Sequence, residues 1–402
     1  MKICLVGVLG RALLREGTGG SEKQIALLGR HFVRRGHHVT LLVTDHAGPD
    51  MQVDGVTLKA AWDPHRGIPR VRAVTYRYPS LAKRLLRERA DLYYVRGATP
   101  FSWVVLRVAR HLDSPGLLGL ASDGDLSPES GQVILGLGSS RSHRVATYAA
   151  WLALQRNALR LADTVVAQNT GQADRCAAMG LPHVLIPSIV EEPQGELLAM
   201  ELDYDVAWVG NVDSNARRSK GIDTLADLAV RLLDVRFAVV GGLGAASIGE
   251  EVARLASLPN VALLGAQTYD EAQRSIARSR VVLNTSPAEG FSNVMLEGWA
   301  LAKPTLALSV NPSDLLGEDG LGRCAGGSVE RLATLVRQSL ADEAWLAASG
   351  QRARDYVRAV HGADAVCSRY EQLAVALASA SPSRTAALAA DSAAAPGPPQ
   401  RQ

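Results

Sequence analysis

The chain has 402 residues, enough for two domains of the usual size of roughly 100–200 residues each. Hydrophobic residues make up 47% and charged residues 21% of the sequence, which excludes a wholly disordered or fibrous chain. No apolar run reaches the about 18 residues that a membrane-spanning helix needs. The cysteines lie far apart and match no metal or disulfide spacing, so we expect reduced thiols in a cytoplasmic protein: Cys4, Cys176, Cys324 and Cys367.

The formal net charge of +3 is unevenly distributed. Residues 1–185 carry 24 Lys and Arg against 14 Asp and Glu, whereas the remaining residues carry 19 against 26. A basic first half indicates an anionic partner there, such as a membrane surface, a phospholipid-linked acceptor or a nucleic acid.

Short β-branched runs alternate with helical patterns from the start of the chain. In residues 21–36, Ile25, Leu28, Phe32 and Val33 share one helical face. The alternation predicts a parallel sheet with crossover helices and therefore an α/β domain over 1–185. The predicted strands are 2–8, 38–44, 91–96, 117–122 and 164–168.

The alternation of strand and helix patterns is interrupted over 186–203, which is rich in Pro and Glu and lacks a clear periodicity. We interpret this segment as a linker between two domains. The alternation then restarts and predicts a second doubly wound domain over 204–343, with a helix over 221–233. The predicted strands there are 204–210, 236–242, 260–265, 279–285 and 304–309.

Two helical stretches follow over 344–380, and we expect the last of them to cross back to the first domain. Residues 381–402 are rich in Ala, Pro and Ser and cannot bury a core, so we expect a disordered tail.

The strongest site signal is the stretch from Glu289 to Glu297, directly after a predicted strand. Ser292 is a candidate cap for a helix running to about Leu301. The free amides at that helix start, at Phe291, Ser292 and Asn293, suit a diphosphate. Glu297 lies about one turn inside the helix, where its carboxylate can accept hydrogen bonds from the vicinal hydroxyls of a ribose. Glu289 can do the same for a sugar ring, although an exposed loop followed by a surface helix has the same pattern.

A second cluster, over 209–225, follows the next domain's first strand and is rich in cations. Arg217, Arg218 and Lys220 can neutralise a leaving diphosphate, or they form a solvated basic turn. A third segment, 17–28, places glycines between the first strand and the first helix, where they permit close approach of a ligand.

Together these segments resemble glycosyltransferase family 4, over nearly residues 1–375. The matching motifs are Gly19-Gly20-Ser21-Glu22, GHHVTLLV (36–43), Lys220-Gly221 after VGN, VVGG (239–242) and Glu-x7-Glu at 289–297. The resemblance implies the GT-B fold, in which two Rossmann-like, doubly wound domains face each other across a cleft. It also implies a retaining, metal-independent hexosyl transfer from a nucleotide-diphosphate sugar, with no cofactor.

By the same resemblance, the second domain holds the donor and the first domain holds the acceptor. Glu297 would bind the ribose and Glu289 the sugar hydroxyls. The phosphates would lie against Lys220 and the segment from Gly290 through Phe291, Ser292 and Asn293. Gly19, Gly20 and Glu22 would form the acceptor or phosphate loop of the first domain.

Two positions depart from the family pattern. The family has an Arg directly after the glycine of VG, whereas here Asn211 follows Gly210, so Arg217 or Arg218 is the candidate replacement. The first-domain strand at 117–122 leads to Asp123 instead of a His. Asp123 can hydrogen-bond a sugar hydroxyl or act as a base on the acceptor, and it can equally cap a loop.

Residues 65–91 carry eight Lys and Arg but only two acids, interleaved with Tyr76, Tyr78, Leu81, Leu85 and Leu86. Such a segment suits an anionic membrane, where each basic residue contributes ~1 kcal/mol, and a peripheral position on the inner face of the membrane. A phosphorylated acceptor or, less readily, an RNA fits the same composition, as does a solvated helix face.

The acceptor is open, and a surface polysaccharide or a glycolipid is the expectation from the family and the basic segment. Two other functions suit the same scaffold. A nucleotide-sugar epimerase or hydrolase would need its own acid–base pair, for which the sequence offers Asp123 or Asp125. A non-catalytic nucleotide-sugar-binding protein is the other alternative, and Asn211 is the residue that favours it.

Overall fold

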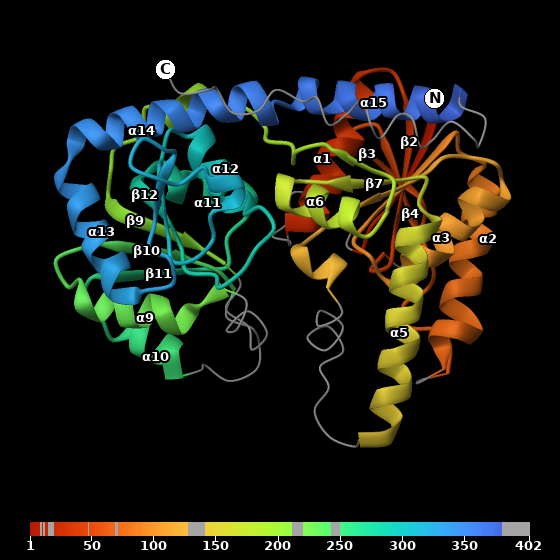
Figure 1. Cartoon of the computed structure of the whole chain (residues 1–402), viewed down its shortest axis with the longest axis horizontal. Coiled ribbons are helices and arrows are strands. Elements are labelled where there is room, and N and C mark those ends of the chain that lie inside the picture. The colour runs from red at the N-terminus through yellow and green to blue at the C-terminus, as the bar shows by residue number, and fades with distance from the viewer. Residues whose placement is uncertain are drawn as a thin grey trace. The chain divides into compact units, whose positions relative to one another are not determined.

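The computed structural model describes residues 1–8, 10, 13–14, 20–46, 48–68, 71–127, 141–210, 220–242 and 250–379, with only the backbone of 141–148. The chain divides into two compact units, each built of helices around a sheet (Figure 1). Unit 1 contains the described residues from Met1 to Ile189 and those from Asp364 onward. Unit 2 contains the described residues from Val190 to Ala363.

Unit 1 is an eight-stranded sheet in the order β3-β4-β2-β1-β5-β6-β7-β8. All neighbouring strands are parallel except β3 and β4. Its strands are β1 (Lys2–Val6), β2 (His38–Val43), β3 (Met51–Val53), β4 (Val56–Ala60), β5 (Leu92–Arg96), β6 (Gly116–Gly119), β7 (Thr164–Ala167) and β8 (His183–Leu185). Its helical elements are α1 (Gly20–Arg34), η1 (Ala73–Arg77), α2 (Tyr78–Glu88), α3 (Pro100–His111), η2 (Asp123–Leu126), α5 (Arg141–Leu161), α6 (Thr170–Ala178) and α15 (Ala363–Ser379), the last from Asp364 onward.

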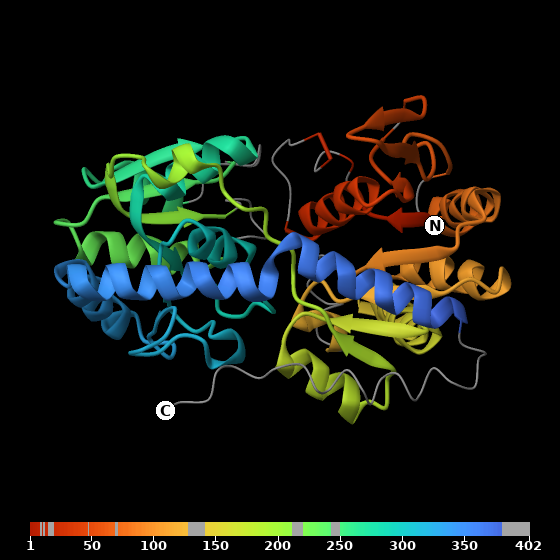
Figure 2. The same cartoon turned by 90° about the horizontal axis from the view of Figure 1, so that it is seen from above.

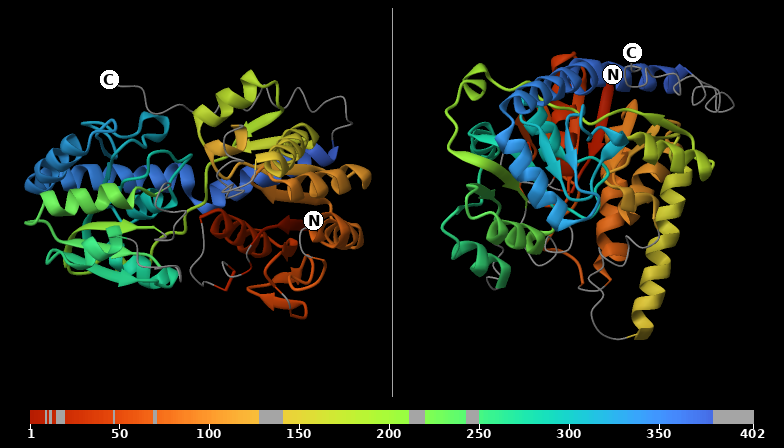
Figure 3. Two further views of the ribbon diagram at one scale, coloured as in Figure 1. Left: turned by 90° about the horizontal axis from the view of Figure 1, so that it is seen from below. Right: turned by 60° about the vertical axis from the view of Figure 1, so that its left-hand side comes forward.

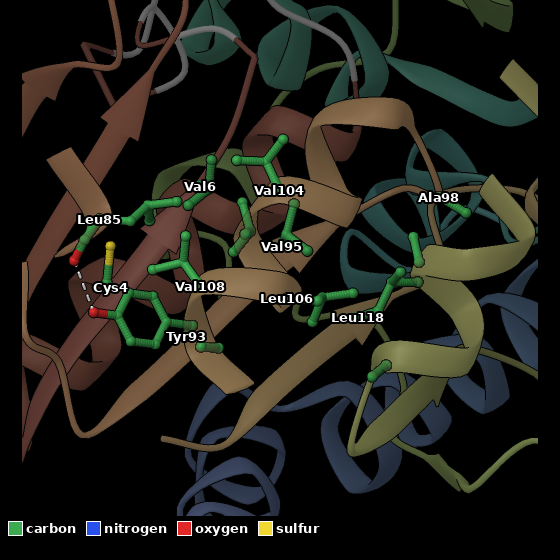
Figure 4. Packing of buried hydrophobic residues seen from close by; sticks show 14 of the residues in the cluster. Cys4, Val6, Leu85, Tyr93, Val95, Ala98, Val104, Leu106, Val108 and Leu118 are labelled. Carbon is green, nitrogen blue, oxygen red and sulfur yellow. Dashed lines mark hydrogen bonds between the residues drawn. The ribbon is translucent and has the colours of Figure 1, made fainter. Parts of the chain in front are cut away.

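The alternation of side chains along β1 places its residues in two cores. Cys4 and Val6 join a buried cluster with residues of α2, α3 and α5, which Figure 4 shows from close by. In this cluster the hydroxyl of Tyr93 donates a hydrogen bond of 2.9 Å to the carbonyl of Leu85. Leu5 points to the other face, where a Cβ placed on Gly29 of α1 would lie 3.2 Å from it. Helices therefore cover both faces of the sheet.

Helix α15 packs on unit 1. The ring of Tyr370 makes edge contacts with Phe32 of α1 and Tyr94 of β5, at centroid distances of 6.4 and 5.7 Å. Glu371 binds Arg35 at 2.6 Å and His37 at 2.8 Å. The chain thus returns to unit 1 after Ala363, as the blue helix beside α1 in Figure 2 shows.

Unit 2 is a six-stranded, wholly parallel sheet in the order β11-β10-β9-β12-β13-β14. Its strands are β9 (Tyr204–Val209), β10 (Phe237–Val240), β11 (Val261–Gly265), β12 (Ser279–Asn284), β13 (Thr305–Ala307) and β14 (Gly322–Cys324). Its helical elements are α7 (Gly195–Leu198), α9 (Ile222–Arg231), α10 (Glu250–Ala256), α11 (Tyr269–Ala277), α12 (Asn293–Ala300), η3 (Pro312–Asp314), α13 (Val329–Ala341), α14 (Glu343–Tyr356) and η4 (Val357–His361).

Helices lie on both faces of the unit 2 sheet, as the two further views in Figure 3 show. One buried cluster joins the sheet to α9, α10 and α13, and a second joins it to α12, α14 and η4. The strand order is the doubly wound order 3-2-1-4-5-6, in which the direction of winding reverses between β9 and β12. The sequence-based prediction of two α/β domains with parallel sheets is therefore confirmed.

All ten predicted strands are present, and the described residues contain four further strands that were not predicted. The edge strands β8 and β14 have three residues each, too few for a recognisable run. Strands β3 and β4 form a hairpin in which Val53 pairs with Val56 across Asp54 and Gly55. Both turn residues have positive φ, 49° and 78°, as a tight two-residue hairpin turn requires. The Asp-Gly pair is therefore a local hairpin signal that the sequence carries.

The unit boundary between Ile189 and Val190 falls within the segment predicted as a linker over 186–203. Before the boundary, the side chain of Gln24 holds Ile189 by two hydrogen bonds, of 2.9 and 2.7 Å. After it, Leu197 and Met200 pack against a buried cluster of unit 2. Parts of the linker segment therefore belong to each unit. The predicted tail, 381–402, lies outside the described residues.

All four cysteines are free, and Cys4, Cys176 and Cys367 are buried. Burial raises the pKa of the Cys176 thiol to about 11 and that of Cys367 to about 12. These thiols are therefore protonated and unreactive near neutral pH. No helix among the described residues is long and apolar enough to span a membrane.

Candidate donor site in unit 2

The winding reversal between β9 and β12 places the loops after these two strands side by side. In an open parallel sheet, ligands bind outside the carboxyl ends of the strands at this point. Gly210 directly follows β9, and Thr285 directly follows β12. The segments predicted to carry the donor, 209–225 and 289–297, belong to the chain after these two strands, so the topology itself brings them together.

A chain of hydrogen bonds ties the two loops together. The indole N–H of Trp208 donates to the hydroxyl of Thr285 at 2.8 Å, and that hydroxyl donates to the carbonyl of Lys220 at 2.7 Å. Trp208 and Thr285 are buried, which makes these bonds costly to break. A Cβ on Gly210 would come within 2.8 Å of the Trp208 ring, so a glycine is required for this packing.

Lys220 and Glu289 form an ion pair across this junction. The Lys220 Nζ lies 2.6 Å from the Glu289 Oε1, and the Ser286 hydroxyl donates to the same oxygen at 2.5 Å. The side chains of Lys220 and Glu289 are 34% and 14% exposed, respectively. A cation and a carboxylate predicted independently, 69 residues apart, are thus in direct contact at the carboxyl edge of the sheet.

Gly221, next to Lys220, has a conformation and a position that exclude any other residue. Its φ of 62° lies in the left-handed region. A Cβ there would lie 2.2 Å from the carbonyl oxygen of Thr285, far inside van der Waals contact. Because Gly221 has no Cβ, its backbone can lie close to that of Thr285. The Thr285 hydroxyl can then donate to the Lys220 carbonyl, which fixes the backbone that carries the Lys220 side chain.

Helix α12 begins at Asn293, and Ser292 occupies its N-cap position, as predicted. The Ser292 side chain, however, makes no capping hydrogen bond, so the predicted role of its hydroxyl is wrong. The residue has extended backbone angles and is buried, and its place is set by packing. Gly290 lies in the loop that joins Glu289 to the helix, and Asn293 is the first residue of the helix.

Glu297 lies in the middle of α12 and is 9% exposed. Its Oε2 accepts a hydrogen bond of 2.9 Å from the side-chain amide of Gln273, on α11. A buried carboxylate needs such a partner, because desolvation otherwise penalises its charged form. Gln273 therefore orients the carboxylate expected to contact a ribose.

Phe291 is part of the hydrophobic core. Its ring contacts those of Trp299 and His361 at centroid distances of 5.9 and 5.1 Å, and the side chain is 8% exposed. A polar ligand at this position can therefore meet only the backbone of Phe291. The ring anchors the loop between Glu289 and α12 to the body of unit 2.

In unit 1, Asp123 and Asp125 lie after β6, as predicted, but their environments differ. The Asp123 carboxylate is 40% exposed and accepts from Arg175 at 2.8 Å and from Gln172 at 3.0 Å. The Asp125 carboxylate is buried and accepts from the amides of Ala98, Ala121 and Ser122. Burial raises the pKa of Asp125 in spite of these bonds. Asp125 thus has a structural role, because its carboxylate holds together the loops after β5 and β6. Asp123 is the more accessible of the two carboxylates.

The predicted phosphate loop of unit 1 is described in part. Gly20 begins α1, and Glu22 lies in its first turn, where a negative charge interacts favourably with the helix dipole. Gly19, Asn211, Arg217 and Arg218 lie outside the described residues. Among the described residues, no group of three or more His, Cys, Asp or Glu side chains is placed to hold a metal ion.

Four residues that support the site were not predicted from the sequence: Trp208, Gln273, Thr285 and Ser286. Thr285 and Ser286 directly follow the strand that leads to Glu289, so their place in the chain was a usable signal. Trp208 reads as an ordinary strand residue in the sequence. Gln273 lies 24 residues before its partner, and only the packing of α11 against α12 reveals its role.

Two protein-family models match the chain. Residues 19–187 match the glycosyl transferase 4-like domain, and residues 203–342 match glycosyl transferases group 1. No curated protein sequence gives a significant match.

Solved structures resemble the whole described fold. Sucrose-phosphate synthase from Thermosynechococcus elongatus superposes with a TM-score of 0.73 at 21% identity, covering 94% of this chain and 100% of that one. Anabaena HepE in complex with UDP and glucose gives a TM-score of 0.67 at 17% identity, with the same two coverages. WaaG, a glycosyltransferase involved in lipopolysaccharide biosynthesis, gives 0.64 at 17%, again with the same coverages. The chain is therefore a glycosyltransferase of the GT-B fold, with a 4-like domain before a group 1 domain.

Proposed function

We propose that the protein transfers a hexosyl group from a nucleotide-diphosphate sugar to an acceptor hydroxyl, with retention of anomeric configuration and without a metal or cofactor. The observation that carries the proposal is the contact between Lys220 and Glu289 at the winding reversal of unit 2. A cation for phosphate and a carboxylate for sugar hydroxyls are thereby held together, one loop away from the start of α12.

The donor is proposed to lie across the carboxyl edge of β9 and β12. The nucleotide end lies toward Glu297, whose carboxylate accepts hydrogen bonds from the two ribose hydroxyls. The diphosphate lies at the N-terminal end of α12, where the amides of 291–293 and the helix dipole favour negative charge. The sugar meets Glu289. The complexes of Anabaena HepE with UDP and with UDP-glucose support a uridine donor as the first candidate.

In the proposed reaction the bond between the sugar's anomeric carbon and the diphosphate oxygen breaks as the acceptor oxygen bonds to the same face of that carbon. The acceptor's proton leaves with the departing diphosphate. Lys220 stabilises the negative charge that develops on the leaving group, together with the amides of α12. Arg217 and Arg218 are the proposed additional cations. The proposed reaction needs no protein nucleophile, because the orientation of donor and acceptor and the stabilisation of the leaving diphosphate lower the barrier.

The acceptor is proposed to bind unit 1, through the loop that carries Gly19, Gly20 and Glu22 and through Asp123. The half-exposed carboxylate of Asp123 can accept from an acceptor hydroxyl while Arg175 holds it in place. A surface polysaccharide or a glycolipid is the proposed acceptor class. Support comes from WaaG, whose named role is in lipopolysaccharide biosynthesis, and from a TarM complex that holds α-GlcNAc-glycerol and UDP.

A thermal-shift panel of UDP, GDP, ADP and CDP sugars tests the donor site. At a concentration of 100 times the dissociation constant, a donor should stabilise the wild type by about 2.7 kcal/mol. Only one nucleotide class should do so, and Glu297→Ala should abolish the shift. Glu330→Ala is the control, because Glu330 is an exposed carboxylate of α13 that pairs with Arg231.

The unliganded melting temperature of each variant shows whether it folds, and Glu297→Gln provides a second variant of nearly the same volume. A wild type that responds to none of the four classes would contradict the donor proposal. An undiminished shift in both folded Glu297 variants would instead show that the donor binds elsewhere.

A further inference from the structure

The segment before α2 exposes large aliphatic side chains to an unusual degree. Ile68 is 70%, Val71 47% and Val74 72% exposed. The amide of Val71 donates to the carbonyl of Ile68, and that of Val74 to the carbonyl of Val71. The three residues therefore follow one another at intervals of three on successive turns. Exposure of three such neighbours has no folding benefit, because each leaves apolar surface in water.

Helix α2 continues this path directly from η1 and has two distinct faces. Leu81 and Leu85 are fully buried in the core of unit 1, and Tyr76 and Tyr78 pack against the same core. The two leucines are therefore not available to a partner, and the two tyrosines present only part of their surface. The exposed residues of the helical path lie on the opposite side: Val71, Val74, Thr75, Pro79, Lys83, Leu86 and Arg87.

The spacing of the exposed residues places them on one stripe. Val71, Thr75, Pro79, Lys83 and Arg87 recur at every fourth position, and positions four apart are neighbours on a helix surface. The stripe is aliphatic at its start and cationic at its end. Val74 and Leu86 lie three positions after Val71 and Lys83, and Ile68 lies three positions before Val71, so they adjoin this row. We call the large aliphatic and cationic members, Ile68, Val71, Val74, Lys83, Leu86 and Arg87, the α2 stripe. In Figure 1, α2 lies on the outer side of unit 1, beyond α3.

The cations of the stripe, Lys83 and Arg87, have no described carboxylate within salt-bridge distance, whereas the neighbouring Arg84 reaches Asp50 at 3.8 Å. The same is true of Arg66 and Arg72, which flank the start of the stripe in the sequence. The guanidinium of Arg66 instead lies over the ring of Tyr76, 5.6 Å from its centroid. These cations are therefore available to a partner with negative charge.

We propose that the α2 stripe docks the protein on an anionic lipid surface, with Ile68, Val71 and Val74 inserted among the lipid chains and Lys83 and Arg87 at the headgroups. Aliphatic side chains beside cations fit this partner, because they bury in the acyl boundary while the charges meet the phosphates. A single-stranded nucleic acid would need exposed aromatic rings for stacking, and the aromatic residues of this segment pack on the core. Docking here would bring a glycosyltransferase to a lipid-linked acceptor.

Vesicle flotation of the full chain tests this proposal. The vesicles are phosphatidylcholine alone or phosphatidylcholine mixed with one-third phosphatidylglycerol, and we expect binding to the anionic vesicles only. Lys83→Ala with Arg87→Ala should weaken the partition coefficient by about 25-fold, since each cation contributes about fivefold. The triple variant Ile68→Ser, Val71→Ser and Val74→Ser should also weaken it by about tenfold or more. Binding of the wild type should fall as the salt concentration rises.

Matched controls come from α5 and α15 of the same unit. Arg156→Ala with Arg160→Ala removes two exposed cations, also four residues apart, on α5, and Val375→Ser removes a 57% exposed valine on α15. Both controls should retain wild-type flotation, and melting temperatures verify that every variant folds. Flotation that is absent, or that the α5 control reduces equally, would overturn the proposal. So would tighter binding to single-stranded RNA than to anionic vesicles.

Discussion

Glu289→Gln should lower kcat/KM for sugar transfer by about a hundredfold or more, the typical loss for one polar group that acts in the transition state. The amide keeps the shape of the side chain and can still accept from Lys220 and Ser286. The amide is uncharged, however, so it cannot hold the Lys220 ammonium as the Glu289 carboxylate does in the wild type, where the two groups are 2.6 Å apart. Steady-state kinetics with the donor identified by thermal shift measure the effect.

The same substitution should change the free energy of unfolding by only about 1 kcal/mol, because the pair is partly exposed to water. Glu330→Gln, on the surface of α13, is the matched control and should retain wild-type kinetics. A Glu289→Gln variant within a factor of about three of the wild type, well below the range for a charged catalytic contact, would remove Glu289 from the mechanism.

Gly221→Ala should destabilise the protein by about 2–4 kcal/mol, which lowers the melting temperature by roughly 4–16 °C for a unit of this size. The left-handed backbone conformation contributes about 1 kcal/mol of this cost. The larger part comes from the new Cβ, which would meet the Thr285 carbonyl at 2.2 Å. Because backbone, rather than a flexible side chain, is in the way, Lys220 must move and activity should fall as well.

Gly326→Ala separates the two contributions. Gly326 has nearly the same φ, 64°, but a Cβ there would meet no atom within 4 Å. It should therefore cost about 1 kcal/mol, the conformational part alone. Thermal melts of the two variants measure the difference. Equal costs at both positions would show that the contact between Gly221 and Thr285 is not tight.

Most of the fold could be predicted from the sequence, because buried parallel strands are continuous apolar runs. Phe237–Val240 is an example. The strands that escaped prediction are at or beside the sheet edges, where partly exposed segments carry less apolar residues. The hairpin at Asp54 and Gly55 did have a local signal, in its turn residues.

The candidate site was predictable where one short segment carries the chemistry. Glu289 and Glu297 lie on one stretch of chain, and Lys220 was recognisable beside Gly221. The supporting contacts were not, since they join distant segments: Gln273 reaches Glu297 from another helix, and Trp208 reaches Thr285 from another strand. The Ser292 side chain makes no capping hydrogen bond although the residue stands at the N-cap position, because tertiary packing determines where it points.

The most direct test of the central claim is the fate of the donor in the presence of an acceptor pool, followed by NMR. The protein, the identified nucleotide sugar and a glycolipid or polysaccharide extract are incubated with and without a metal chelator. We predict that nucleoside diphosphate and glycosylated acceptor form in equal amounts. The new linkage should have the anomeric configuration of the donor, and the chelator should have no effect. Release of free sugar, formation of an epimerised donor, or a donor that is bound but never consumed would contradict the account.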